Sequence, residues 1–205
     1  MMRVAIIGAG PSGFFVAGEL LKRGGVEVHV IERRVAPYGL VRYGVAPDHL
    51  VTRRSTLIFN QVAAMPGFFY HGNVDVGRDM AWADLNAAFH AVVVCTGAER
   101  PNRPDCPGAT LPGVADALSL SRWANGEPEG LPVDWLSVGG PVVIVGNGNV
   151  ALDAVRLLAR SSADWVATDM APAAMEQLAH HRVDRITVVG RRGAASSRHG
   201  EPAGD

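Results

Sequence analysis

Three glycines near the N-terminus have the spacing of a loop that binds a dinucleotide. Gly8, Gly10 and Gly13 form the pattern G-x-G-x-x-G in the stretch RVAIIGAGPSGFF. In such a loop the first glycine permits a tight turn, the second lets the backbone approach a pyrophosphate, and the third lets a helix lie close to a strand. Pro11 suits the first turn of that helix, where an N–H has no partner in any case. The helix would direct its free N–H groups and the positive end of its dipole at the phosphates.

The residues on both sides of this loop predict a strand, a helix and a second strand. Residues 4–7 are all apolar, as expected of a strand buried on both faces of a parallel sheet, and residues 14–22 suit a helix packed on that sheet. Gly24 and Gly25 would end the helix, and residues 26–31 predict the next strand, with Glu32 at its end. A carboxylate in that place accepts hydrogen bonds from ribose hydroxyls. The whole pattern predicts a dinucleotide site, against the alternative of a glycine-rich turn in an unrelated fold, and the motif alone does not separate FAD from NAD.

A second glycine loop repeats this arrangement later in the chain. Residues 142–145 predict another buried strand, and Gly146, Gly148 and Ala151 form G-x-G-x-x-A, with alanine in place of the third glycine. Residues 150–158 predict the helix that follows. Two such loops indicate two dinucleotides, or a halved repeat of one ancestor.

The strand predicted at residues 185–190 runs into Arg191 and Arg192. An NAD site usually has a carboxylate in that position, whereas a guanidinium pairs with the 2′-phosphate of NADP. The arginines therefore favour NADP over NAD, and a pair of solvated arginines at a strand end is the alternative. The interval from Ala151 of the second loop to these arginines is longer than usual. We interpret residues 161–182 as an insert that accounts for the extra length, mobile or disordered and with a short helix at 172–181.

Composition excludes several classes of protein. The 205 residues are 48% hydrophobic and 19% charged, so the chain can bury a core, and its net charge of −1 argues against non-specific binding of nucleic acid. No apolar run is long enough for a transmembrane helix, and the run before Gly8 is too short for a signal peptide, so a cytoplasmic protein is expected. Cys95 and Cys106 form neither a CxxC pair nor a zinc-ligand set, no metal site is expected, and Cys95 is interpreted as a small buried thiol.

The stretch ERRVAPYGLVRYGVAPDHL, residues 32–50, reads as an ordered loop rather than a helix, and it carries a specific resemblance. It resembles the signature of adrenodoxin-reductase-type ferredoxin–NADP(+) reductases, P-x-G-L-V-R-x-G-V-A-P-D-H, without a gap. The resemblance continues through GNVDVGRD (72–79), HAVVVCTGAE (90–99), LPGV (111–114), GNGNVALD (146–153) and VVGRRG (188–193).

The resemblance implies an α/β fold with a Rossmann-like FAD-binding domain at residues 1–101 and the start of a second Rossmann-like, NADP-binding domain at 102–192. Residues 193–205 show no hydrophobic periodicity, so a disordered tail is expected there. It implies these FAD-binding residues: Gly8, Gly10, Pro11, Ser12, Gly13, Glu32, Arg33, Gly39, Leu40, Val76, Thr96 and Gly97. The NADP-binding residues that it implies are Asn147, Gly148, Asn149, Val150, Arg191 and Arg192.

Two residues are catalytic candidates by the same resemblance. His49 would lie near the isoalloxazine ring and tune flavin protonation, or it is simply a histidine that is hydrogen-bonded in a loop. Asp153 would lie near the nicotinamide pocket, or it is a helix N-terminal charge.

The electron acceptor implied by the resemblance is a ferredoxin-type iron–sulfur protein. Ferredoxins are generally acidic, so arginines on a docking face would speed the encounter. The candidates are Arg33, Arg34, Arg42, Arg53 and Arg54. For each of them a solvated face is the favoured alternative, and Arg42 is a candidate for a structural role.

The resemblance ends after Gly193, so the chain is expected to be the N-terminal half of a reductase: a fragment, a prematurely ended gene product or one with an altered reading frame. Three functions compete: an FAD- and NADP-dependent reductase, a non-catalytic dinucleotide-binding remnant, and a related flavoenzyme such as a glutamate-synthase small-subunit-like protein or a disulfide reductase. The missing CxxC argues against a disulfide reductase, and the uninterrupted 37–49 loop argues against the glutamate-synthase type. The first fits the family, and the second is favoured for the activity of this chain.

Overall fold

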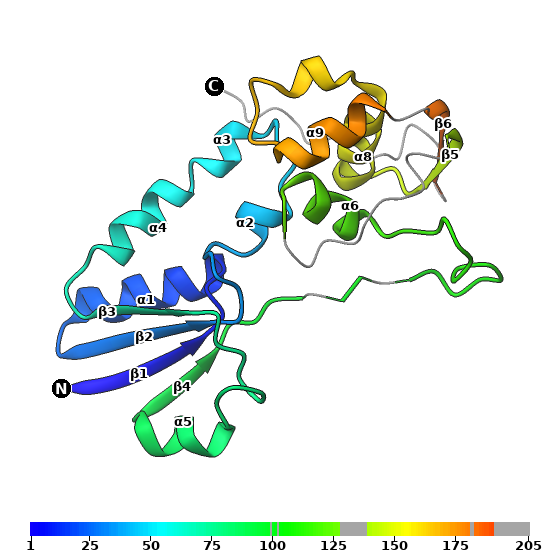
Figure 1. Cartoon of the computed structure of the whole chain (residues 1–205). Helices are drawn as coiled ribbons and strands as arrows, with labels where there is room; N and C mark the ends of the chain where they lie inside the picture. Colours follow the sequence, from blue (N-terminus) through cyan, green and yellow to red (C-terminus); the bar gives the residue numbers. More distant parts are fainter. Residues whose placement is uncertain (99, 102, 128–138, 181–182, 191–205) are drawn as a thin grey trace. The chain divides into compact units, whose positions relative to one another are not determined.

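The computed structural model describes residues 1–98, 100–101, 103–127, 139–180 and 183–190 (Figure 1). Contacts divide the chain into two compact units. The first unit comprises Met1–Val45 and Val51–Pro101, and the second comprises Ala46–Leu50 and Asn102–Asp205. The short segment Ala46–Leu50 therefore leaves the first unit, contributes to the second, and is followed by residues that belong to the first again.

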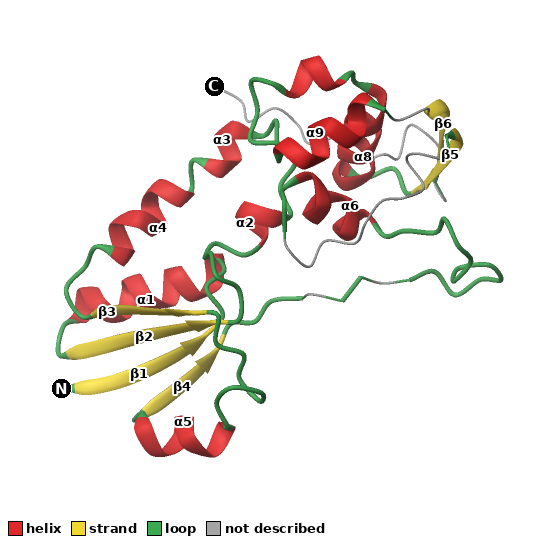
Figure 2. Ribbon diagram, in the orientation of Figure 1, coloured by secondary structure: helices red, strands yellow, loops and turns green. Residues whose placement is uncertain are grey.

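A four-stranded parallel sheet is the centre of the first unit, in the order β3-β2-β1-β4 (Figure 2). The strands are β1 (Met2–Ile7), β2 (Val26–Glu32), β3 (Phe68–Gly72) and β4 (Ala91–Val94). The helices of this unit are α1 (Pro11–Arg23), α2 (Leu40–Tyr43), α3 (Leu50–Arg53, whose first residue is grouped with the second unit), α4 (Thr56–Ala63) and α5 (Trp82–Ala88).

Alternation along β1 gives the sheet two apolar faces. Val4 and Ile6 belong to a core cluster with Phe14 of α1 and Phe59 of α4. Ala5 and Ile7 belong to a second cluster, which includes Leu85 of α5. Because successive side chains of a strand point to opposite faces, one all-apolar strand supplies both clusters, as its sequence predicts.

In its described part, the second unit holds two parallel strands, β5 (Gly140–Val145) and β6 (Val183–Val189). Its helices are α6 (Ala117–Ala124), α8 (Asn149–Ala159), the 3₁₀-helix η1 (Ser162–Trp165) and α9 (Pro172–Ala179). A single apolar cluster joins these helices, with the fully buried Trp165 and Leu178 among its members. Val142 and Ile144 of β5 pack against the same cluster.

Strand β5 differs from the expected strand that is buried on both faces. Its residues alternate between half-buried and exposed, and the side chains of Val143 and Val145 are 61% and 77% exposed. Strand β6 is also largely exposed. The helical cluster covers one face of the β5–β6 pair, so within the described residues the other apolar face meets solvent.

Two loop predictions were wrong. Residues 161–180 are not a mobile insert, because η1 and α9 bury Trp165, Ala174 and Leu178 in the core of the second unit. The short helix expected at 172–181 is confirmed as α9, and residues 181–182 lie outside the described part. The stretch 32–50 includes the single-turn helix α2, whose end is fixed by the Gly44 N–H donating to the Leu40 carbonyl. One turn is too short to show an apolar period, which is why the sequence read as a loop.

Candidate functional site

The first glycine loop connects β1 to α1, and two of its glycines are fixed by lack of space. Gly8 has φ +104°, and a Cβ there would lie 2.4 Å from the Cys95 carbonyl oxygen. A Cβ on Gly13 would lie 2.1 Å from the Gly8 carbonyl oxygen, because α1 begins directly against the turn. These are the roles that the spacing predicts for the first and third glycines.

Gly10 is different, because the chain leaves the space beside it open. No atom lies within 4 Å of the position that a Cβ would take, and its φ of −80° and ψ of −177° suit any residue. No side chain caps the N-terminus of α1, and Pro11 occupies its first turn. The exposed N-terminus of a thirteen-residue helix and a bare Cα together form a surface that a phosphate can approach closely.

Glu32, at the end of β2, is buried with 6% of its surface exposed. Its Oε2 accepts a hydrogen bond from the Ala9 N–H (2.8 Å), and its Oε1 accepts one from the Arg34 N–H (3.0 Å). The carboxylate thus ties the glycine loop to the strand end. The Arg34 Nη1 also lies 3.8 Å from Oε1, and each oxygen has a second lone pair beyond its backbone contact.

A pocket at the carboxyl ends of the strands gathers several of the predicted residues. It is lined by Ile7, Gly8, Ile31, Glu32, Arg33, Val74, Asp75, Val76 and Thr96. Five of these, Gly8, Glu32, Arg33, Val76 and Thr96, are in the predicted set. Asp75 was not predicted, although the neighbouring Val76 in the same VDV stretch was. In open parallel sheets this edge is where ligands bind.

The loop after β2 lies against the glycine loop. The Tyr38 N–H donates to the Ala9 carbonyl (2.8 Å), and Gly39, with φ +48°, would bring a Cβ within 3.1 Å of the Gly10 Cα. Leu40, the residue after Gly39, is 48% exposed. Gly39 is therefore needed for close approach of two backbone segments, which gives it a structural role beside the predicted cofactor contact.

The remaining predicted residues of the first unit are exposed. Ser12 lies in the first turn of α1, and Thr96 and Gly97 follow β4, with Gly97 at φ +70°. Burial raises the pKa of the Cys95 thiol, which is only half-buried rather than fully buried as expected.

The second glycine loop connects β5 to α8 in the same way. Gly146 has φ +129°, and a Cβ there would meet the Ala151 Cβ at 3.9 Å, so the small third residue of the motif suits close packing. Gly148 has no atom within 4 Å of the position of a Cβ, its φ of −90° is unstrained, and no side chain caps the N-terminus of α8. Asn149 and Val150 are exposed in the first turn of that helix.

Asn147 lies over the end of β6. A Cβ on Gly190 would approach the Asn147 side chain to 2.9 Å, and the Gly146 N–H donates to the Val189 carbonyl (2.7 Å). Arg191 and Arg192, predicted to bind the 2′-phosphate, lie outside the described residues.

Both catalytic candidates belong to the second unit, and they lie together. The His49 Nε2 is 3.4 Å from the Asp153 Oδ1. Arg156, one turn along α8 from Asp153, donates from Nη1 to that same oxygen (2.9 Å) and makes an Nη2 contact of 2.9 Å with the His49 Nε2. The structure therefore brings together two side chains that are about a hundred positions apart in the sequence, around a guanidinium that was not predicted.

Asp48 is the main partner of that guanidinium. Arg156 donates to it twice, from Nε to Oδ2 (2.9 Å) and from Nη2 to Oδ1 (2.8 Å), and Arg160 adds a third contact at 3.1 Å. Burial raises the pKa of Asp48, but the hydrogen bond and charge of Arg156 outweigh it, so the pKa is lowered overall. The hydrogen bond to Asp48 raises the pKa of Arg156, which stays charged.

A signal for this cluster is present in the sequence of α8. Asp153 and Arg156 are three residues apart and share one face of α8, and Arg160 follows four residues later at the residue that ends the helix. That stripe predicts a charged partner for the helix but does not name Asp48, which comes from a segment 108 residues away.

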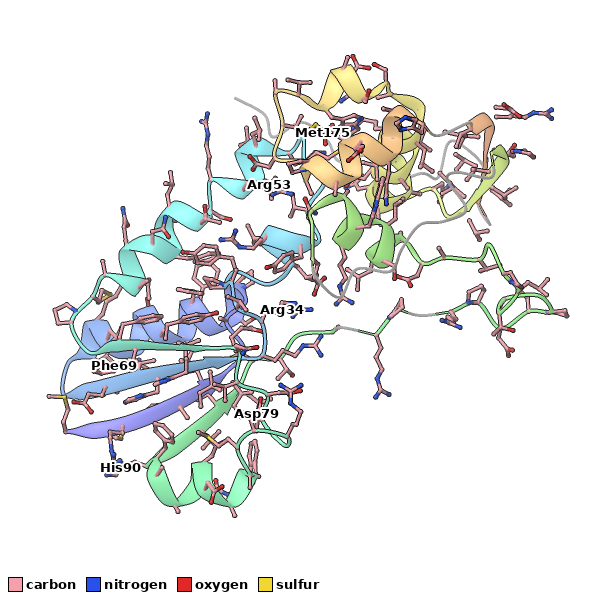
Figure 3. The ribbon with its side chains drawn as sticks, viewed as in Figure 1. Arg34, Arg53, Phe69, Asp79, His90 and Met175 are labelled. Carbon is pink, nitrogen blue, oxygen red and sulfur yellow. The ribbon has the colours of Figure 1, made fainter. Side chains whose placement is uncertain are left out.

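Three of the candidate docking arginines contact their own loop (Arg34 and Arg53 are labelled in Figure 3). The Arg34 Nη1 lies 3.8 Å from the Glu32 Oε1, and its guanidinium lies over the Tyr43 ring. The Arg42 Nε donates to the Pro37 carbonyl (2.9 Å), and its guanidinium lies over the Tyr38 ring. The Arg53 Nη2 donates to the Val45 carbonyl (2.8 Å). These contacts support the structural role expected of Arg42, and they give Arg34 and Arg53 structural contacts that the sequence did not predict.

Among the described residues, no helix is long and apolar enough to cross a membrane, and no group of three or more His, Cys, Asp or Glu side chains could hold a metal ion. Cys95 and Cys106 are both free thiols.

Comparisons with known proteins confirm the resemblance and the α/β fold. A probable ferredoxin/ferredoxin--NADP reductase of Mycobacterium bovis is 43% identical over 198 residues, which make up 96% of this chain and 34% of that protein. Human mitochondrial NADPH:adrenodoxin oxidoreductase is 40% identical over 191 residues, 93% of this chain and 39% of the relative. The structure of Mycobacterium tuberculosis FprA in complex with NADPH matches with a TM-score of 0.88 and 36% identity, over 96% of this chain and 45% of that one.

This chain spans little more than a third of the length of those curated relatives. A family model, that of the pyridine nucleotide-disulphide oxidoreductases, matches residues 2–192, which is nearly the whole chain. With its two glycine loops, its parallel strands and this match, the chain belongs to the pyridine nucleotide-disulphide oxidoreductase family.

Proposed function

We propose that this chain is the cofactor-binding part of a flavoprotein reductase that passes electrons from NADPH through FAD to a ferredoxin-type iron–sulfur protein. The observation that carries the proposal is the pair of uncapped helix N-termini, one in each unit, each following a G-x-G turn at the end of a parallel strand. FAD supplies the chemistry of accepting a hydride and releasing single electrons, and the chain binds and orients the two dinucleotides.

The first unit fits FAD through two features. The pyrophosphate binds against the bare Cα of Gly10 and the N–H groups at the start of α1, because no atom of the chain lies within 4 Å of the position of a Gly10 Cβ. The free lone pairs of Glu32, in the pocket beside it, accept hydrogen bonds from ribose hydroxyls. Arg33, Val76 and Thr96 line the rest of the pocket, and Asp75 joins them as a candidate contact.

The second unit fits a second dinucleotide by the same reasoning. No atom lies within 4 Å of the position of a Gly148 Cβ at the N-terminus of α8. The neighbouring residues in the sequence are Asn147, Asn149 and Val150. The preference for NADP over NAD depends on Arg191 and Arg192 and stays a prediction from the sequence. His49 and Asp153 are the proposed catalytic residues, as the resemblance implies.

The test of the first unit is a visible absorption spectrum of the purified chain before and after addition of FAD. We expect the bands of bound oxidised flavin near ~380 and ~450 nm. The matched control is Gly10→Ala, because the backbone there suits alanine and no atom obstructs the methyl group. This variant should keep its circular dichroism and lose the flavin. A wild-type chain that stays colourless in excess FAD contradicts the proposal.

The test of the second unit is anaerobic addition of NADPH to the flavin-loaded chain. We expect the flavin absorbance to bleach in the wild type and not in Gly148→Ala, whose methyl group would enter the open space at α8 without strain. Equal bleaching in both proteins would place the nicotinamide dinucleotide elsewhere.

A second candidate function is dinucleotide binding without electron transfer. The described residues supply the two glycine loops and uncapped helix N-termini that binding needs, whereas electron transfer is proposed from the names of the relatives. The same experiments separate the two functions: a bound flavin that NADPH does not bleach supports the second candidate. The iron–sulfur partner and the cytoplasmic location stay predictions, the partner on the ground that the relatives are named for ferredoxin and adrenodoxin.

A further inference from the structure

The cluster around Arg156 contains a conflict that decides where a proton sits on His49. Two groups approach the same ring nitrogen: the Arg156 Nη2 at 2.9 Å and the Asp153 Oδ1 at 3.4 Å from Nε2. A guanidinium can only donate hydrogen bonds, and a carboxylate can only accept them. The two neighbours therefore require opposite states of Nε2, with a lone pair toward Arg156 or an N–H toward Asp153.

The distances favour Arg156. Its contact to Nε2 has the length of a charge-assisted hydrogen bond, whereas the 3.4 Å contact of Asp153 is longer than such a bond. The Asp153 carboxylate does not depend on His49 for a hydrogen bond, because its Oδ1 already accepts one from the Arg156 Nη1 at 2.9 Å. One guanidinium thus donates to both acceptors, the Asp153 Oδ1 and the His49 Nε2.

Arg156 is itself held in place by Asp48. The two hydrogen bonds to the Asp48 carboxylate, at 2.9 and 2.8 Å, fix the plane of the guanidinium. Asp48 is well shielded, with 14% of its side chain exposed. It precedes His49 directly in the chain, so the same five-residue segment supplies the anchor and the histidine.

We infer that Arg156 is a positioning residue that holds neutral His49 in the Nδ1–H form by donating to its Nε2. A neutral histidine side chain free in water prefers the other form, with the proton on Nε2. The arginine therefore reverses the intrinsic preference, and the proton that neutral His49 can donate lies on Nδ1, away from α8. The consequence for electron transfer rests on the proposed function, whereas the hydrogen-bond assignment rests on the geometry alone.

Protonation of the ring changes the partner of Nε2. A proton taken from solvent water on Nε2 leaves two donors in opposition, so the Nη2 contact must break while Nη2 keeps its bond to Asp48. The new N–H then donates to the Asp153 Oδ1, the nearest acceptor. Among the described residues, hydrogen bonds and ion pairs place Asp153 and Arg156 at the ring, Asp48 joins them through Arg156, and Arg160 joins through Asp48.

The test is long-range proton–nitrogen correlation NMR on the full chain with ¹⁵N-labelled histidine, at an alkaline pH where imidazole is neutral. The His49 signals are assigned by their loss in His49→Gln. In the wild type we expect Nδ1 to resonate as a protonated nitrogen and Nε2 as an unprotonated one. In Arg156→Met the pattern should invert, because Asp153 then offers the only strong partner among the groups named above.

Two further variants separate positioning from folding. Arg156→Lys keeps a charge for Asp48, but its side chain is one bond shorter and has no atom at the position of Nη2. The hydrogen bond to the His49 Nε2 should then be lost and the pattern should invert, while the thermal unfolding temperature changes little. Arg160→Gln removes the other contact of Asp48 and should leave His49 as in the wild type. If Arg156→Met does not fold, the wild type and Arg156→Lys decide.

The inference is overturned by a wild-type His49 that carries its proton on Nε2, by an unchanged pattern in the folded Arg156 variants, or by inversion in Arg160→Gln. None of these results depends on flavin. If the chain binds no FAD but His49 carries its proton on Nδ1, the proposed function is contradicted and this inference stands. If the chain binds FAD but His49 lacks the Nδ1 proton, the inference is contradicted and the proposed function stands.

Discussion

Gly13 leaves no room for a side chain, and this gives a prediction about stability. The added methyl group of Gly13→Ala would meet the Gly8 carbonyl oxygen at 2.1 Å, a backbone atom that the turn holds in place. Overpacking of this kind costs about 1–3 kcal/mol or more, which exceeds the ~1 kcal/mol that alanine gains over glycine in a helix. We expect Gly13→Ala to unfold at clearly lower urea concentration than the wild type.

The matched control for Gly13→Ala is Gly10→Ala. The two substitutions lie three residues apart, but the second places its methyl group in open space, so its stability should stay within about 0.5 kcal/mol of the wild type. Equal losses in both variants would contradict the assignment of Gly13 to packing and Gly10 to ligand approach.

Residue spacing predicted the first loop because its constraints are local. Gly8, Gly10 and Gly13 act within one turn, and Glu32 reaches the Ala9 N–H from the end of the next strand. The Arg156 cluster could not be predicted in this way, because its hydrogen bonds to Asp48 join positions 108 residues apart. No periodicity relates those two segments, so only the folded chain brings them together.

At the scale of elements, helix η1 shows how composition misled the prediction of a mobile insert. The segment 161–180 has small and polar residues around its few apolar ones, and its elements are only four and eight residues long. What orders it is one large side chain, since Trp165 is fully buried in the core of the second unit and Arg160 lies over its ring. A single buried indole contributes no period that a sequence pattern would show.

Trp165→Ala should therefore destabilise the second unit strongly. Truncation of a fully buried tryptophan costs about 3–5 kcal/mol, through lost burial and the cavity left behind. Val166→Ala, at the neighbouring position with 74% exposure, should change stability by less than about 0.5 kcal/mol. Thermal unfolding followed by circular dichroism measures both, and a harmless Trp165→Ala would mean that the segment is not anchored in this core.

The exposed face of the β5–β6 pair shows the same limit from the opposite direction. An apolar run predicts a strand that is covered on both faces, and the strand is present, but Val143 and Val145 face solvent. Sequence indicates what a residue could bury, whereas the neighbouring elements decide what it does bury.

At the scale of the whole molecule, we expect stability to decrease as pH falls below about 7. Burial, and then the charge of His71, lower the pKa of His29 in the folded chain, so the unfolded chain binds the proton first. A histidine with a lowered pKa stabilises the fold above the unfolded value of about 6.5 and loses that contribution as pH falls through the folded value. Asp48, whose pKa is also lowered, adds a second loss below about pH 4.

The measurement is the urea midpoint as a function of pH. His71→Gln removes the neighbouring imidazole, whose Nε2 lies 2.9 Å from the His29 Nδ1, and keeps a group that can form hydrogen bonds. The urea midpoint of this variant should decrease less between about pH 7 and 5 than that of the wild type, because the charge of His71 no longer opposes protonation of His29. A wild-type midpoint that is constant over that range would contradict the prediction.

The segment Ala46–Leu50 has a consequence for modularity. Along the sequence, residues 1–101 and 102–205 look like two exchangeable modules, but Asp48 and His49 are grouped with the second by contact. A gene fusion or a domain exchange joined at residue 101 would deliver α8 without the partner of Arg156. The residues that must be inherited together are therefore discontinuous in the sequence. Recombination between relatives should preserve the Arg156 cluster only where Ala46–Leu50 and α8 come from the same parent.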